Sequence, residues 1–396
     1  MNRRILALLL VLVMVAGLMT GCASGRQEAA APETARPKSP AVEETAAEPE
    51  QTEESPAEEE APAEPETVSF TDSLGRTVEL LADITRIAPS GAVATMILAA
   101  IAPECMVTIN AAPSESQMAF LPANLAALPE TGQMYGSKAN LNLETLLAAD
   151  PQVVIDLGDK KGDMAEDLDA LQAQIGIPVV FIEADLAHMA AAFRTLGGLL
   201  SGKSDRGEEL AALVDRTTAM AEENAAKITD DTRVRVMYTT GEDGLGTNAA
   251  GSVQAQVLDM VGVENAVVVE DVSGKGGGNI ISLEQLYNFD PDVILFADGS
   301  IYSTVTDDSA WSQLTAISTG KYYEVPGSPY SWLSGPPSMN MILGVWWLGN
   351  LIYPEIYDYD METMTQELYK TLWGYELSSE EVTALLGNST LKAAAQ

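Results

Sequence analysis

The 396-residue sequence has one histidine, His188, and two cysteines, Cys22 and Cys105. A single histidine excludes the HExxH zinc motif, and the GxSxG pattern of serine hydrolases is absent as well. Sites for bare zinc or manganese usually collect several histidine and carboxylate ligands, which also disfavours a free-metal receptor. Cys105 has no partner cysteine in the body of the chain, so we expect it to be a small buried residue. Enzymatic activity is therefore not expected.

Basic residues are scarce. The chain carries 21 lysines and arginines against 58 acidic residues, a net charge of −37. Beyond residue 66 there are 16 basic and 45 acidic residues, a net charge of −29. A surface of this charge repels nucleic acid and anionic lipid, so neither is expected as a partner.

Long apolar runs are missing after the N-terminus. Ile5–Leu18 is an apolar run of about 14 residues behind Arg3 and Arg4, and it is too short to span a membrane comfortably. It ends in LMTGC, which resembles the lipobox of bacterial lipoproteins, although Met19 stands where leucine is usual. We expect residues 1–22 to be a signal peptide and Cys22 to carry a lipid on the outer face of the cell membrane. The alternative is ordinary secretion with a free Cys22.

Large apolar side chains are nearly absent from the next segment. Residues 26–66 contain 13 Glu, 7 Pro and 3 basic residues. Such a composition cannot bury enough surface to offset its ordering entropy. We therefore expect residues 23–67 to form a disordered acidic linker, with a reach of roughly 35 Å.

From residue 68 onward, strand-like and helix-like segments alternate, which is typical of α/β layers with mostly parallel sheets. We expect an N-terminal lobe at 68–185, a bridging helix at 186–228 with a break near 198–207, and a C-terminal lobe at 229–396. A helical bridge is stiffer than paired hinge strands, so large closure is not expected. The expected strands are 86–89, 107–110, 153–157, 179–183, 234–239, 267–269, 293–297 and 322–325. The expected helices are 91–101, 143–149, 252–261, 283–289 and 338–353.

One segment occurs twice. NLETLLAADPQVVID at 142–156 matches SLEQLYNFDPDVILF at 282–296, with a constant offset of 140 residues. Asn142 and Ser282 suit helix N-caps, and Asp-Pro ends each short helix before a buried strand. Glu144 and Glu284 each favour the dipole of their helix. Helix chemistry alone does not require both halves to repeat this glutamate.

Ligands of open parallel α/β sheets bind beyond the carboxyl ends of the strands. This rule selects the loops 90–91, 110–115, 134–135, 159–161, 240–248, 300–302 and 327–336. Their aromatic side chains suit a large, flat or greasy ligand, and two lysines suit an anionic complex. The candidate ligand-binding residues are Asn110, Tyr135, Lys160, Lys161, Tyr238, Asn248, Tyr302, Tyr330 and Trp332.

Three of these candidates have competing interpretations. Lys160 and Lys161 also fit an exposed turn, and Tyr135 also fits packing at the rim of a lobe. Trp332 lies in PYSWLSGPPS, a segment that we do not expect in a core. GKGGGN at 274–279 lacks the spacing of a phosphate-binding loop, so nucleotide binding is not expected.

The body of the chain resembles the binding proteins for iron–siderophore complexes, haem and cobalamin that serve ABC importers. The resemblance covers about 68–388 and is carried by FTDSLGRTVEL (70–80), RIAPSG (86–91), the repeated pair, GIPVVFIE (176–183), GTNAAGSVQAQVLDMVGVEN (246–265) and PPSMNMILGVWWLGNLIYPE (336–355). It implies two α/β lobes joined by one long rigid helix, in agreement with the independent interpretation above.

The resemblance also implies roles for residues and partners. Glu144 and Glu284 match the glutamates that pair with arginines of the permease, one on each lobe. Tyr135 matches the place where haem binders can carry a phenolate ligand. The implied cargo is an iron(III)–siderophore complex, with cobalamin, haem or a nickel or cobalt chelate as alternatives. No intrinsic cofactor or metal is implied, and the partners are an ABC permease with its ATPase. We expect a monomer; an adhesin or sensor without an importer is the alternative of a different class.

Overall fold

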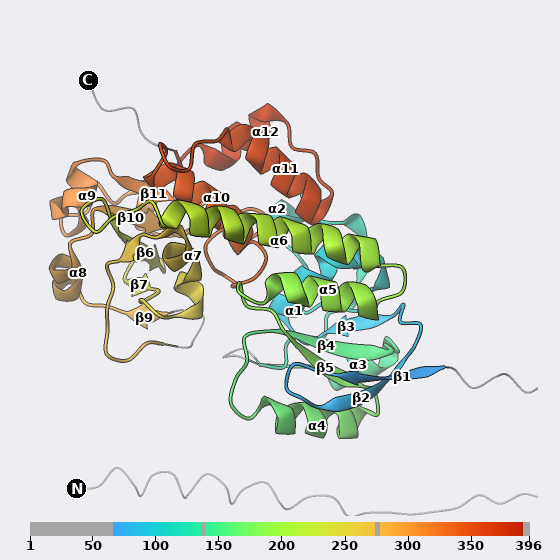
Figure 1. Cartoon of the computed structure of the whole chain (residues 1–396). Coiled ribbons are helices and arrows are strands. Elements are labelled where there is room, and N and C mark those ends of the chain that lie inside the picture. The colour runs from blue at the N-terminus through green and yellow to red at the C-terminus, as the bar shows by residue number, and fades with distance from the viewer. Residues whose placement is uncertain (1–65, 136–138, 274–277, 391–396) are drawn as a thin grey trace, which may run out of the picture. The chain divides into compact units, whose positions relative to one another are not determined.

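The computed structural model describes residues 66–135, 139–273 and 278–390 (Figure 1). The described residues belong to one compact unit that begins at Pro62. The expected signal peptide, Cys22 and almost all of the expected linker lie outside the described residues, as does most of the GKGGGN segment.

The first sheet is parallel, with the order β3–β4–β5. Its strands are rich in Val and Ile and are almost completely buried, as expected for strands covered on both faces. They are β3 (Ile87–Pro89), β4 (Val153–Gly158) and β5 (Val179–Glu183), preceded by an antiparallel hairpin of β1 (Thr67–Thr71) and β2 (Thr77–Leu81). The helices of this part are α1 (Ala92–Ile101), α2 (Glu115–Met118), α3 (Leu143–Ala148) and α4 (Met164–Ile175), with 3₁₀ turns η1 (Pro103–Cys105) and η2 (Ala123–Ala127).

The expected strand at 107–110 is wrong. The N–H of Val107 donates to the carbonyl oxygen of Ile87, whereas the N–H of Ile109 donates to that of Pro129. Because alternate residues pair with different segments, only isolated bridges form here. The other three strands expected in this half are present.

The second sheet has the order β11–β10–β6–β7–β9, with β8 paired to β6. β6, β8, β10 and β11 are parallel, and β7 and β9 add an antiparallel edge. The strands are β6 (Arg235–Thr240), β7 (Gly246–Thr247), β8 (Glu264–Asn265), β9 (Asn279–Ile280), β10 (Val293–Phe296) and β11 (Tyr322–Glu324). The expected strand at 267–269 is wrong, because the side-chain oxygen of Asn265 accepts the N–H of Val267 and turns the chain out of the ladder.

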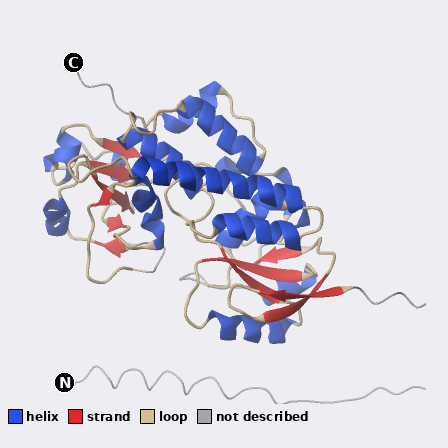
Figure 2. Ribbon diagram, in the orientation of Figure 1, coloured by secondary structure: helices blue, strands red, loops and turns tan. Residues whose placement is uncertain are grey.

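Helices surround this second sheet and follow it to the C-terminus (Figure 2). They are α7 (Gln256–Val261), α8 (Leu283–Phe289), α9 (Thr315–Ser318), α10 (Met341–Ile352), α11 (Met361–Trp373) and α12 (Ser379–Leu386), with 3₁₀ turns η3 (Val253–Ala255), η4 (Ile301–Ser303) and η5 (Trp311–Gln313). Among the described residues, no helix is both long and apolar enough to cross a membrane.

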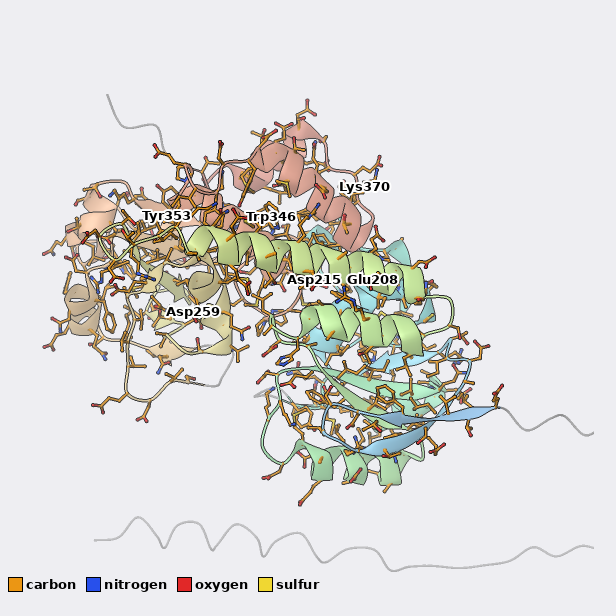
Figure 3. The ribbon with its side chains drawn as sticks, viewed as in Figure 1. Glu208, Asp215, Asp259, Trp346, Tyr353 and Lys370 are labelled. Carbon is orange, nitrogen blue, oxygen red and sulfur yellow. The ribbon has the colours of Figure 1, made fainter. Side chains whose placement is uncertain are left out.

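The stretch between the two sheets contains two helices, α5 (Met189–Leu199) and α6 (Ser204–Ala225), with a turn at 200–203 inside the expected break. α6 is the long connecting helix: it packs on α5 and α1 beside the first sheet and on α7 and α10 beside the second. Arg194 of α5 binds both Glu208 and Asp215 of α6, and Figure 3 shows these two carboxylates where α6 lies beside α5. The fold is therefore two α/β lobes joined by one long helix.

Candidate ligand-binding cleft

Three adjoining cavities form a cleft lined by residues of both lobes. The central cavity has a volume of 440 Å³, and Gln133 also lines a second cavity of 490 Å³. A third cavity of 200 Å³ shares Ala92 and Pro336 with the central one and Asn110 with the second. The second lobe contributes Gln254 and residues 335–337 to the central cavity. Cavities of this combined extent suit a ligand larger than a single amino acid.

The beginning of α1 forms part of the lining of the central cavity. Residues 91–94 line the cavity, and no described side chain caps this helix terminus. The first N–H groups of an α-helix have no partners within the helix, and the helix dipole adds positive potential there. The sequence places this terminus here because β3 leads through Ser90 and Gly91 directly into AVATMILAAI, in which the alanines, Met96 and Leu98 favour helix.

Asp156, on β4, lies beside this helix terminus. Its side chain is only 5% exposed and lines the central cavity. The Ser90 hydroxyl donates to Asp156 Oδ1, whereas Oδ2 has no hydrogen-bond partner among the described residues. Burial raises the pKa of Asp156 to about 6, against the opposing effects of Ser90 and Lys161.

Tyr135 and Lys161 complete the polar wall of the central cavity. The Tyr135 hydroxyl oxygen is buried and has no partner among the described residues. Burial, together with the charge of Asp156, raises the Tyr135 pKa far above its usual range, so this phenol keeps its proton at neutral pH. Lys161 Nζ lies 3.5 Å from Asp159 Oδ1 and remains largely exposed.

The structure brings four of the predicted ligand-binding residues to the cleft. Tyr135 and Lys161 line the central cavity, Tyr330 lines the third, and Asn110 lines the second and third. All four come from loops selected by the rule of strand carboxyl ends.

The remaining five do not line these three cavities. Lys160 is exposed and its ammonium group donates to the Ser73 carbonyl oxygen. Tyr302 packs against Phe296 and Tyr322 in the core of the second lobe. Tyr238, Asn248 and Trp332 are buried.

The prediction that the segment around Trp332 stays out of the core is wrong. Trp332 is 0% exposed, and its ring centroid lies 6.3 Å from that of Tyr369 on α11. The prolines and glycines around it indicated a surface loop, but α10 and α11 fold over this segment. Only the packing of α10 and α11 brings the side chain inside.

Asp156 is not among the predicted ligand-binding residues, because it stands within the apolar run VVIDL of an expected buried strand. The internal repeat held a signal, since the 140-residue offset aligns Asp156 with Phe296. A carboxylate in one half at the position of a core phenylalanine in the other half indicates that this residue serves a purpose other than core packing. Pro336 ends the selected loop 327–336, whereas Gln133, Gln254 and Pro337 lie outside the selected loops and have no comparable signal.

The repeated glutamates occupy matching positions on α3 and α8. Asn142 and Ser282 each accept the N–H of the third helical residue, and Glu144 and Glu284 are exposed in the first turns. Leu146 and Leu286 are both completely buried. The repeat therefore holds in three dimensions as well as in sequence.

His188 stands at the start of α5, exposed, and binds Asp185 through Nδ1 at 2.6 Å. Asp185 raises the His188 pKa. Within the described part of the chain, no three His, Cys, Asp or Glu side chains gather as a metal site.

Two lobes joined by a long helix, with a cleft lined by both lobes, are the architecture of a class of solute-binding proteins. Residues 97–329, more than half of the chain, match the family model described as periplasmic binding protein. The chain belongs to this family, whose members act outside the cytoplasm and deliver ligands to ABC permeases, and it is a binding protein and not an enzyme.

Solved structures support this assignment. An ABC transporter solute-binding protein from Sulfurospirillum deleyianum is 28% identical, with a TM-score of 0.74, and the match covers 81% of this chain and 99% of that chain. A periplasmic solute-binding protein from Veillonella parvula is 25% identical, with a TM-score of 0.67 and coverages of 82% and 98%. The molybdate-bound periplasmic protein MolA of Haemophilus influenzae shares the fold at 21% identity, with a TM-score of 0.63 and coverages of 78% and 99%. No curated protein sequence matches the chain.

Proposed function

We propose that this protein captures an iron(III)–siderophore-type complex in the cleft and delivers it to an ABC permease. The observation that carries the proposal is the cleft itself, which consists of three adjoining cavities, two of them lined by residues of both lobes. Tyr135 and Tyr330 supply aromatic surface, and Lys161 supplies positive charge for an anionic complex. Cobalamin, haem and other chelated transition metals are the alternative cargoes.

A binding titration tests the cargo. The full-length protein contains five tryptophans, so intrinsic fluorescence can be followed while ferric siderophores, haem, cobalamin and nickel or cobalt chelates are added. We expect one ferric siderophore class to bind with a Kd below about 1 μM, equivalent to roughly 8 kcal/mol. Failure of every chelate to bind at this level contradicts the proposal.

Delivery to the permease is assigned to Glu144 and Glu284. Both are exposed on equivalent helices, one on each lobe, and such a pair can meet arginines through charge-assisted contacts. A rigid connection between the lobes would keep the distance between Glu144 and Glu284 constant.

Charge reversal tests this assignment. The double variant Glu144→Lys/Glu284→Lys should bind the cargo normally and lose most of its uptake in cells. The matched control is Glu362→Lys/Glu380→Lys, which reverses two exposed glutamates in the first turns of α11 and α12. Equal uptake by both double variants rules the docking role out.

Membrane attachment is assigned to a lipid on Cys22, which lies outside the described residues. Cys22→Ser should move the protein from the membrane fraction to the soluble fraction after cell lysis. We propose that the anchored protein acts as a monomer. Retention of Cys22→Ser in the membrane fraction contradicts lipid attachment at this residue.

A further inference from the structure

The central cavity offers more hydrogen-bond donors than acceptors. The donors are the first N–H groups of α1, the Lys161 ammonium group and the Tyr135 hydroxyl. Gln133 and Gln254 present amides that can donate or accept, whereas ionised Asp156 can only accept. A ligand group that satisfies such a cavity carries several acceptor oxygens and at most one hydrogen.

The beginning of α1 supplies the main donor surface. α1 is ten residues long, Gly91 precedes it without a capping side chain, and residues 91–94 all line the cavity. Backbone N–H groups and the positive end of the dipole together favour an anion at this place.

An independent observation points to a ligand at the same place. Asp156 is 5% exposed, and its Oδ2 atom has no hydrogen-bond partner among the described residues although it belongs to a cavity-lining side chain. Leaving a buried carboxylate oxygen unpaired destabilises the folded protein. A hydrogen on the ligand, or on Asp156 itself, would complete the set of contacts.

We propose that the central cavity is a subsite for an oxygen anion, either a carboxylate or a tetrahedral oxyanion, that shares one hydrogen with Asp156. The N–H groups of α1, Lys161 and Tyr135 bind its oxygens, and Asp156 Oδ2 takes part in the single hydrogen bond that remains. The inference rests on the proposed function only in assigning this group to an iron chelate. A free inorganic oxyanion has the same chemistry.

Ionisation of Asp156 makes the subsite selective for an anion that carries a hydrogen. The polar or charged groups that act on this carboxyl are Ser90, Lys161, the backbone N–H of Leu157, Asp159 and Tyr135. Burial raises the Asp156 pKa to about 6, so the carboxyl is ionised at pH 8 and largely protonated at pH 5. Phosphate carries a hydrogen at both pH values, whereas sulfate carries none. Ionised Asp156 therefore accepts phosphate and rejects sulfate.

Isothermal titration of the full-length protein with phosphate and with sulfate at pH 5 and pH 8 tests the subsite. Phosphate should bind at both pH values. Sulfate affinity should fall about 100-fold from pH 5 to pH 8, since one required proton costs tenfold for each pH unit above the pKa. Asp156→Asn should remove this pH dependence. Binding of neither anion, or equal binding of both at pH 8, overturns the proposal.

Two lysine variants separate local from general charge effects. Lys161→Ala should weaken both anions by about tenfold or more, the usual effect of losing a charged hydrogen bond. Lys321→Ala removes the same charge from an exposed site on the second lobe and should change neither affinity. Equal effects of the two variants contradict a local site. Circular dichroism melting confirms that each variant is folded.

Iron chelates identify the source of the anion. At pH 5, where Asp156 is largely protonated, ferric citrate, which carries carboxylates, should compete with phosphate and lose about tenfold or more in affinity in Lys161→Ala. Ferrioxamine B, a hydroxamate chelate without a free carboxylate, should have the same affinity for Lys161→Ala as for the unaltered protein. If phosphate binds and no iron chelate does, the proposed function fails and the subsite stands. If iron chelates bind, phosphate does not compete and Lys161→Ala has no effect, the subsite fails and the proposed function stands.

Discussion

Asp156 occupies a position where a buried parallel strand normally carries an apolar side chain. Its neighbours on β4, Ile155 and Leu157, are buried in the core. All the remaining residues of the strand except Gly158 are apolar. Ionised carboxyl groups are costly to bury, and this cost appears as a pKa raised to about 6. Perturbed groups that line cavities are frequent at functional sites. We therefore expect that Asp156 destabilises the folded protein and is retained because it takes part in binding.

Replacement of Asp156 by asparagine should stabilise the protein at neutral and alkaline pH. A carboxyl whose pKa is higher in the folded state than in the unfolded state binds more protons when folded, so stability falls as pH rises between the two pKa values. The penalty is absent below about pH 4 and complete above about pH 6. We expect Asp156→Asn to raise the free energy of unfolding at pH 8 by on the order of 2 kcal/mol. Urea denaturation at pH 4 and pH 8 measures it, and an equal gain at both pH values contradicts the electrostatic origin.

Glycines determine how the helices of the connecting stretch pack. Gly197 of α5 and Gly207 of α6 are in close contact: a Cβ on Gly207 would lie 2.6 Å from the carbonyl oxygen of Phe193 and 2.8 Å from the Gly197 Cα. The sequence predicts a helix break near 198–207, a range that ends at Gly207 and begins one residue after Gly197. Both lie inside helices, and the turn of the chain is at Gly202, which has a φ of 68°. Here a missing side chain allows close helix contact.

Gly207→Ala should therefore destabilise the protein by about 1–3 kcal/mol, because the backbones of α5 and α6 must separate to admit a methyl group. Gly198→Ala is the control on α5, where a Cβ would have nothing within 4 Å. It should be neutral or stabilising by up to about 1 kcal/mol, since alanine favours helix. Chemical denaturation compares the two, and a Gly207→Ala variant as stable as Gly198→Ala would show that the contact tolerates a side chain.

The short repeated helices can be predicted from the sequence, unlike the contact between Gly197 and Gly207, because the residues that begin and end them are close along the chain. Asn142 and Ser282 cap α3 and α8, and Asp150 and Asp290 have positive φ angles of 50° and 35° at the ends of these helices. Each feature depends on residues within a few positions along the chain. Both helices could therefore be predicted from the sequence.

In the described part of the molecule, a second set of contacts joins the two lobes in addition to α6. Arg206 of α6 donates to the Ala100 carbonyl oxygen at the end of α1 at 2.9 Å and to the Thr371 carbonyl oxygen of α11 at 2.6 Å. Phe120 of the first lobe packs edge-on against Tyr369 of α11, with ring centroids 5.5 Å apart. One hydrophobic cluster continues from β4 and α1 through α6 to α10 and α11. These contacts favour small relative movements of the lobes.

Ligand binding should therefore leave the arrangement of the lobes nearly unchanged. We expect a difference in radius of gyration of about 1 Å or less between the free and the bound protein, as in pre-organised complexes. Small-angle X-ray scattering with and without a saturating ferric chelate measures this change. A closure of several ångströms would show that α6 and α11 do not restrain the lobes.

The sequence by itself determined what depends on neighbouring residues: six of the eight expected strands, the capped repeated helices, the connecting helix and the loops at the carboxyl ends of the strands. Hydrophobic periodicity and capping act over a few residues, so a sequence displays them directly. Only the tertiary structure decided which loop residues reach the cleft. Trp332 became core because α10 and α11 cover it, and Asp156 became a cleft residue because β4 ends beside the start of α1. Burial and proximity of this kind arise from contacts between distant segments, which no local pattern in the chain encodes.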